Sequence, residues 1–140
     1  MTTTTLDRTA PATTRVGLTR AFTVVGAAIT AVAIWAISVP LLGAHLLVRF
    51  GSGAAQSIGV DYVIGGTVIA SLAAWGVLAL LERRTPRAHA IWTALAAVVL
   101  IASLGLPLTA ATTTSTGAVL VVMHVAVAAV LVVGLRRGGR

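Results

Sequence analysis

Four long apolar blocks are the feature that most constrains this chain. Each holds roughly the 20 apolar residues that cross a bilayer as a helix, and none alternates as a barrel strand would. Of the 140 residues, 58% are hydrophobic and only 9% are charged, whereas a soluble domain carries about 25% charged residues. We therefore predict an all-α fold, a bundle of four transmembrane helices. The predicted spans are residues 21–43, 62–81, 88–110 and 117–135.

The positions of the arginines predict how these spans are oriented. Three arginine clusters precede the first block, fill the loop between the second and third blocks, and follow the fourth, whereas only Arg49 falls in another loop. Because basic residues stay on the cytoplasmic side of a bilayer, we expect both termini to be cytoplasmic. The clusters are Arg8, Arg15 and Arg20; Arg83, Arg84 and Arg87; and Arg136, Arg137 and Arg140.

The net charge of +7 does not point to nucleic acid, because the arginines flank apolar blocks and form no soluble basic face. The expected partner is the lipid bilayer of the plasma membrane. Each arginine near an anionic headgroup contributes about 1 kcal/mol of binding. A homo-oligomer or a membrane-protein partner is left open. The arginines expected at the headgroups are Arg83, Arg84, Arg87, Arg136 and Arg137.

The parts of the chain outside the blocks are short. Residues 1–20 are polar and threonine-rich and are predicted to form a disordered cytoplasmic leader; residues 21–135 form the membrane domain, and residues 136–140 a basic cytoplasmic tail. In a rival interpretation the first block is a secretory signal peptide. Its apolar stretch exceeds the 7–15 residues of a signal core, and its removal would leave arginine clusters that compete for one side.

The loops predict which helices are neighbours. The loops "ERRTPRA" and "TAATTTSTG" are short, so the second and third helices, and the third and fourth, should pack antiparallel. The first outer loop is the longest. Its "HLLVRF" segment is expected to continue the helix or lie in the interface, and "GSGAAQSIG" is expected to be flexible.

His124 is an ionisable residue inside the fourth span. It lies seven residues from the outer end of its span, and Ser103 lies seven residues from the outer end of the third. Pro107 has no N–H for the carbonyl four residues earlier, which is that of Ser103. A hydrogen bond from His124 to the carbonyl or hydroxyl of Ser103 would satisfy both groups. The predicted polar cluster comprises His124, Ser103, Pro107 and Thr109.

Three roles for His124 are considered. It could fix helix packing through that hydrogen bond, it could bind a proton or ligand in an outward-facing cavity, or it could ligate a metal or haem. His45 and Asp61 could add ligands on the outer side, but their spacing matches no metal motif. We therefore expect no metal and no cofactor.

Other residues are assigned to packing or to the interface. Trp92 is predicted to lie in the inner aromatic belt, whereas Trp35 and Trp75 lie deeper and their indole N–H groups need acceptors. Two rows of small residues allow close helix approach, within the chain or between copies. The rows are Ala27 and Ala31 on the first helix, and Gly66, Ala70 and Ala74 on the second.

Several short segments resemble a known family when they are taken in order. They are "WAISVPLLG", "VRFG", "AWGVLALLERRTPRA", "SLGLPLTAATTT" and the "MH" of the fourth block. Together they resemble a family of actinobacterial four-span membrane proteins of unknown function, of the domain-of-unknown-function 6069 type, over about residues 20–135. The resemblance implies four helices and no assigned activity. A basic set made only of arginine also fits a GC-rich actinobacterial genome.

The sequence leads to two expected functions. The first is a non-enzymatic structural or accessory role in the plasma membrane. The second is a small transporter or channel-like protein with an outward vestibule near His124, Ser103 and Thr109. An enzyme is not expected, because the chain has no cysteine and no carboxylate inside a predicted span.

The predicted orientation can be tested with reporters fused after Arg140. Green fluorescent protein at this site should fluoresce and alkaline phosphatase should be inactive, because the arginine distribution places this end in the cytoplasm. A phosphatase inserted in the loop around Gly53 should be active, as the matched control. Phosphatase activity at the C-terminus would contradict the orientation.

Overall fold

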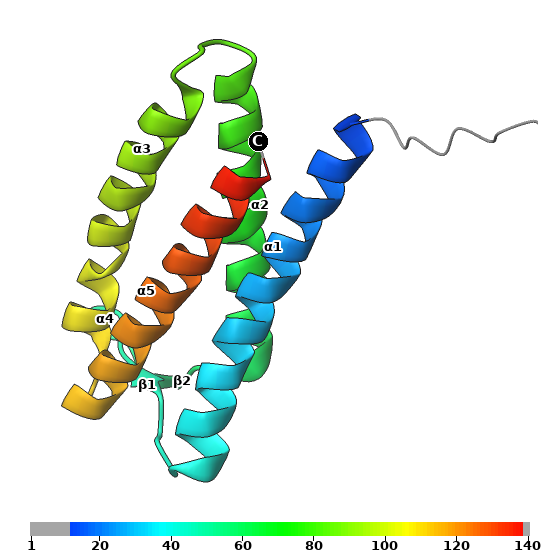
Figure 1. The fold of residues 1–140 in the computed structure, drawn as a ribbon. Helices are drawn as coiled ribbons and strands as arrows, with labels where there is room; N and C mark the ends of the chain where they lie inside the picture. Colours follow the sequence, from blue (N-terminus) through cyan, green and yellow to red (C-terminus); the bar gives the residue numbers. More distant parts are fainter. Residues whose placement is uncertain (1–11, 139–140) are drawn as a thin grey trace, which may run out of the picture.

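The structure contains four helices long and apolar enough to cross a membrane, which confirms the predicted all-α four-helix bundle (Figure 1). It is a computed structural model and describes residues 12–138. The first span is α1 (Ala12–Ala36) followed by a π-helical turn, η1 (Ile37–Leu41), and the third is α3 (Ala88–Ser103) followed by α4 (Gly105–Ala110). The other two are α2 (Val60–Glu82) and α5 (Thr114–Arg137).

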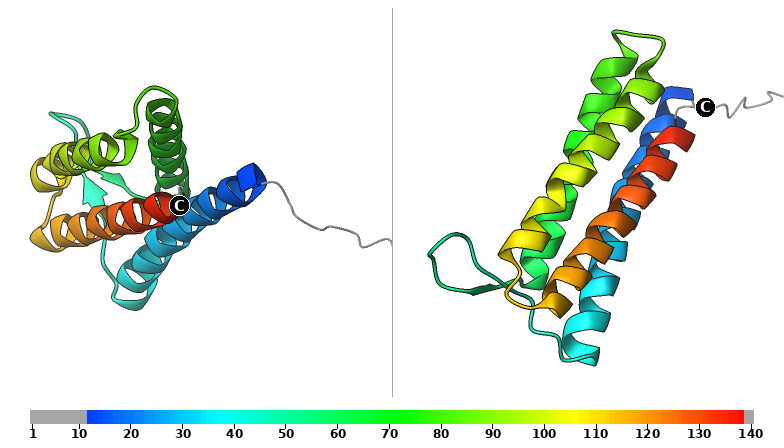
Figure 2. Two further views of the ribbon diagram at one scale, coloured as in Figure 1. Left: turned by 45° about the horizontal axis from the view of Figure 1, so that its top comes forward. Right: turned by 90° about the vertical axis from the view of Figure 1, so that its left-hand side faces the viewer.

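The helices run up and down through the bundle. The first turn of α1, the α2–α3 loop and the end of α5 lie at one end, which we call the inner end, and the α4–α5 loop lies at the opposite, outer end (Figure 1). Helix α1 packs along α5 and α2, and α3 contacts both α2 and α5 (Figure 2). The antiparallel neighbours predicted from the short loops are therefore confirmed.

Helix α1 begins at Ala12, so the prediction that residues 1–20 are a disordered leader is wrong for residues 12–20. The extension is stabilised by tertiary contacts, because Arg20 is buried and pairs with Glu82 of α2. Thr19 also donates a hydrogen bond to the carbonyl of Arg15. The rest of the predicted leader, and residues 139–140 of the predicted tail, lie outside the described residues.

The two intramembrane prolines interrupt their helices in different ways. Pro40 lies inside the π-helical turn η1, where the amide of Leu42 donates to the carbonyl of Ile37 at 3.0 Å. A wider turn is a common way for a helix to accommodate a disturbance of its hydrogen-bond ladder. Pro107 follows a break at Leu104, which separates α3 from α4. These breaks give both helices an irregular outer end.

The first outer loop forms a β-hairpin, so the expectation that "HLLVRF" continues the helix is wrong, and its interfacial alternative stays a prediction. Gln56 and Ser57, within the segment expected to be flexible, are paired in a strand. Strand β1 (Leu47–Val48) pairs antiparallel with β2 (Gln56–Ser57). The amide of Arg49 donates to the carbonyl of Ala110, which ties the hairpin to the α4–α5 loop. Leu46 and Val48 are buried, so the alternation in "LLV" fits a strand with one buried face. The hairpin covers the outer end of the bundle.

Close packing of α1 against α5 depends on small residues. Ala27 and Ala31 are fully buried, which places the first predicted row of small residues at a helix interface. On α5, a Cβ atom added at Gly134 would lie 2.9 Å from the Cβ of Thr23 and would overlap its side chain. Van der Waals contact between backbones, which small residues permit, is a main source of helix association in lipid.

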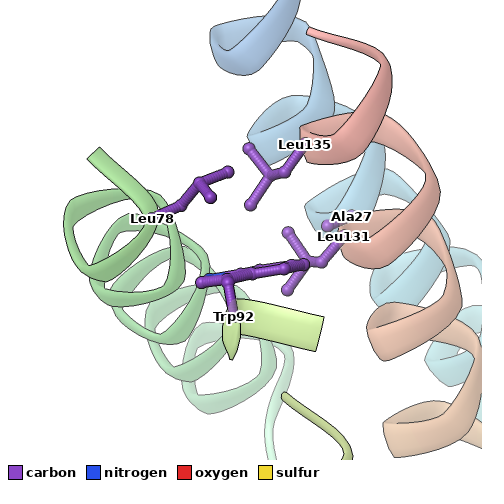
Figure 3. Packing of buried hydrophobic residues seen from close by; sticks show 5 residues of the cluster. All are labelled: Ala27, Leu78, Trp92, Leu131 and Leu135. Atoms are coloured by element: carbon purple, nitrogen blue, oxygen red, sulfur yellow. The ribbon is translucent and has the colours of Figure 1, made fainter. Parts of the chain in front are cut away.

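A cluster of large side chains fills the inner half of the bundle (Figure 3). Trp92 of α3 lies among Leu78 of α2, Leu131 and Leu135 of α5, and Ala27 of α1. Its ring is only 3% exposed. Its indole N–H donates to the carbonyl of Ala74 at 2.9 Å. The prediction that Trp92 belongs to an interfacial belt is therefore wrong, because α2 supplies the acceptor that the buried indole needs.

An ion pair joins the helices at the inner end. The guanidinium of Arg20 lies 2.6 Å from Glu82 Oε1, and the two side chains are 6% and 29% exposed. The Nε2 atom of His89, at the start of α3, lies 3.6 Å from the same carboxylate oxygen. The sequence predicts for Arg20 only a role in the orientation of the spans. In the structure Arg20 also forms a tertiary contact between α1 and α2.

Replacing Glu82 with glutamine should destabilise the bundle, because a buried guanidinium would lose its charged partner. We expect the free energy of unfolding to fall by about 1.5–3 kcal/mol, the usual range for a hydrogen bond to a charged group. Thermal unfolding in detergent measures the change. Asp61→Asn is the matched control, since it makes the same chemical change at an exposed site on the same helix. Equal unfolding temperatures for the two variants would contradict the role of the ion pair.

Candidate functional site

A cavity of about 610 Å³ lies between α2, the α3–α4 helix pair and α5. We call it the central cavity. Its lining extends from Val48 and Tyr62 near the outer end to Trp92 and Leu131 near the inner end. Its volume falls within the 300–1,000 Å³ typical of small-molecule sites. The lining is almost entirely apolar. Its hydroxyl and imidazole groups belong to Tyr62, Thr67, Ser103 and His124.

Small residues on α2 create much of the space. Gly66, Ala70 and Ala74 all line the central cavity, together with Ala73. Gly66 and Ala70 are exposed, whereas Ala74 packs against the cluster around Trp92. Only the inner end of this row therefore lies in a helix contact. The two rows look alike in sequence, but one closes a helix interface and the other leaves a cavity open.

Helix α3 is held to the bundle mainly at its ends. Its buried residues are Ala88 and Trp92, both in its inner turns. In α4 the buried residues are Pro107 and Ala110. Between these two anchor points, Leu95 and the residues that follow it are largely exposed. The middle of α3 therefore borders the central cavity without closing it.

Three of the four residues in the predicted polar cluster line the central cavity: His124, Ser103 and Pro107. The fourth, Thr109, is exposed, and its hydroxyl donates to the carbonyl of Gly105. Thr109 is not part of the cavity lining, so the structure does not bring it together with the other three. The similar depth of His124 and Ser103, estimated by counting residues, agrees with their meeting at one cavity.

The predicted hydrogen bond between His124 and Ser103 is replaced by bonds within each helix. His124 Nδ1 lies 2.7 Å from the carbonyl oxygen of Leu120, one turn earlier. The Ser103 hydroxyl donates to the carbonyl of Leu100 at 2.8 Å. Polar side chains in helices commonly bond to a carbonyl of the preceding turn. Each side chain is thus satisfied locally, and no interhelical bond is required to hold it.

Possible metal ligands do not gather in the described part of the chain. Within residues 12–138, no group of three His, Asp or Glu side chains is close enough to hold an ion. His45 is exposed on the outer side, and Asp61 is exposed in the first turn of α2. His89 lies at the inner end beside Glu82. The three histidines therefore occupy separate places.

Two features of the cavity were missed by sequence reasoning. Trp92, which the sequence predicts at the interface, lines the cavity, and no signal in the sequence indicates this position. Met123 was given no role, but it is buried beside His124 and lines the cavity. A flexible methionine next to a polar residue in a span is typical of adaptable binding surfaces.

Comparison with known proteins identifies the family. The chain is a multi-pass membrane protein by its four apolar spans. Residues 11–140 match the model described as "Family of unknown function (DUF6069)", and the chain therefore belongs to this family. No curated protein and no solved structure matches the chain. The match agrees with the unknown-function family that the sequence resembles, and the family description assigns no function.

Replacing His124 with leucine should leave stability nearly unchanged. The Leu120 carbonyl also accepts the backbone bond of its own helix, so the substitution leaves no unsatisfied group. We expect a change below about 0.5 kcal/mol in the free energy of unfolding, as for sites without special features. Trp92→Phe, which removes a bond to another helix, is the comparison and should unfold at a lower temperature. A loss above about 1 kcal/mol for His124→Leu would instead support a packing role.

Proposed function

We propose that this protein is a non-enzymatic plasma-membrane protein that binds a hydrophobic molecule in the central cavity, within the bilayer. The observation that carries the proposal is the cavity itself: about 610 Å³, lined by apolar side chains of α2, α3, α4 and α5, with Thr67, Ser103 and His124 among its few polar residues. Ligand sites are usually apolar cavities with a small number of placed polar groups. This arrangement has that composition.

The surroundings of His124 favour binding over packing. A packing role requires a partner for the imidazole on another helix, but its hydrogen bond is to Leu120 of its own helix. A vestibule requires a cavity that reaches the imidazole, and the central cavity does so. The mostly aliphatic lining also favours an apolar ligand over a hydrated ion, which needs a polar path.

The arginine distribution supports the orientation within this proposal. With both termini in the cytoplasm, the hairpin and the outer end of the cavity face the exterior. Arg83, Arg84, Arg136 and Arg137 are exposed at the inner end, where anionic headgroups would contact them. We infer the plasma membrane of an actinobacterium from the composition and from the order of the family-like segments.

Binding can be measured by the fluorescence of Trp92, which lines the cavity. The chain has three tryptophans, so Trp35→Phe and Trp75→Phe leave Trp92 as the only reporter. In a nonionic detergent, 1-bromohexadecane should quench the fluorescence of Trp92 until its site is saturated. Saturation should occur at the same mole fraction of probe in the micelle at every micelle concentration. Heavy-atom quenching by free probe in the micelle would instead rise linearly.

The cavity is then filled by Ala70→Phe. Ala70 is exposed and lines the cavity, so a phenyl ring would occupy the space in place of the ligand. Affinity for the probe should fall at least about fivefold, given 1 kcal/mol or more for overfilling a site. Ala97→Phe, at an exposed alanine outside the cavity lining, should bind normally. If quenching rises linearly and Ala70→Phe does not change it, the proposal is overturned. The structural or accessory role would then be the favoured function.

A further inference from the structure

The polar groups of the central cavity can be sorted into donors and acceptors. His124 Nδ1 faces a carbonyl oxygen at 2.7 Å, and a carbonyl only accepts hydrogen bonds. Nδ1 must therefore carry the proton, and in a neutral imidazole the other nitrogen, Nε2, is then an acceptor. Nε2 has no hydrogen-bond partner among residues 12–138 and is not among their fully buried unpaired atoms. It offers a lone pair at the middle of the cavity.

Ser103 offers acceptors as well. Its hydroxyl proton is donated to the carbonyl of Leu100, which leaves the lone pairs of Oγ available. Its own carbonyl faces the position four residues later, which is Pro107, and proline has no N–H to donate. In a bilayer no water replaces a donor that a helix break removes. Thr67 of α2 also lines the cavity and brings one hydroxyl proton. Acceptors therefore outnumber donors among these polar groups.

A cationic donor does not suit this centre. Of the acidic residues in the described chain, Asp61 is exposed at the start of α2 and Glu82 pairs with Arg20 at the inner end. Neither lines the central cavity. A charge at mid-membrane depth without a counter-ion is expensive. The ligand that completes this centre must donate a hydrogen bond while remaining neutral.

The depth of His124 in the bilayer restricts the size of the ligand's polar group. His124 lies ten residues from the start of α5, which is roughly 15 Å of helix rise and about half the 30 Å hydrocarbon core. A phospholipid headgroup stays at the interface, so only a small polar group would reach this depth. From Ser103 to Trp92 the lining continues for eleven residues of α3. That distance is roughly 16 Å, about the length of one leaflet's chains.

Building on the proposed function, we propose that the central cavity binds a long-chain lipid alcohol, with its hydroxyl donating to His124 Nε2 and its apolar chain extending toward Trp92. A hydroxyl is the smallest neutral donor, and it brings a proton to a group of side chains in which acceptors outnumber donors. The chain fills the space beside the small residues of α2. The site selects its ligand by a hydrogen-bond donor and by apolar length, not by charge.

Two probes that differ by one hydrogen-bond donor test this assignment. They are 16-bromohexadecan-1-ol and its methyl ether, which keeps the oxygen but has no O–H. With Trp92 as the only tryptophan, the alcohol should bind about 2- to 10-fold more tightly than the ether, the range for one net hydrogen bond. Equal saturable binding of both probes would overturn the lipid-alcohol assignment and leave the proposed function standing. Absence of saturable binding by either would overturn both.

Two variants test whether His124 accepts the hydrogen bond that makes the alcohol bind more tightly than the ether. His124→Leu should bring the alcohol-to-ether ratio close to one, and His45→Leu, at an exposed histidine outside the cavity lining, should leave it unchanged. If His124→Leu does not fold, the ratio in the parent protein decides the matter alone. The protonated 16-bromohexadecylamine is the third probe. Tighter binding of the amine than of the alcohol would overturn the choice of a neutral donor.

Discussion

The bilayer offers no hydrogen-bond partner to a polar group, and this constraint governs most of the structure. Within the spans, hydroxyl side chains donate to carbonyls of their own helix, as Thr30 does to Gly26 and Ser71 does to Thr67. The imidazole of His124 does the same. Two indoles instead bond to other elements, Trp35 to Ile58 and Trp92 to Ala74. In the described chain, side-chain bonds from a span to another element also include the Arg20–Glu82 pair and the hydroxyl of Thr116, which donates to the carbonyl of His45.

Since polar contacts between helices are few, small residues decide where the helices meet. Ala27 and Ala31 allow α1 to lie against its neighbours, and Gly134 accommodates Thr23. On α2 the small residues face a region that α3 does not fill, because α3 is anchored only near its two ends. The same kind of residue therefore produces tight packing on one side of the bundle and an opening on the other.

Much of the architecture could be predicted from the sequence because it depends on length and composition. The helix count follows from four apolar blocks, and the pairing of neighbours from two short loops. The β-hairpin could not be predicted in this way, because its pairing depends on the amide of Arg49 meeting the carbonyl of Ala110. The start of α1 was also missed, since a distant partner for Arg20 outweighs the local polarity of residues 12–20.

The candidate site was predicted in part for the same physical reason. Counting residues along two helices was enough to give His124 and Ser103 similar depths, and a proline was enough to indicate a carbonyl without its usual donor. The direction of each side chain was not available, because rotation about a helix axis depends on packing with the other helices. The hydrogen bond to Leu120 was therefore missed.

That local bond changes what the imidazole can do. In an interhelical bond to Ser103, His124 would have used its proton inside the cavity. Because it donates to Leu120 instead, its proton does not reach Ser103, and Nε2 remains an acceptor. The excess of acceptors at its centre gives one chemical class of lipid an advantage over the others.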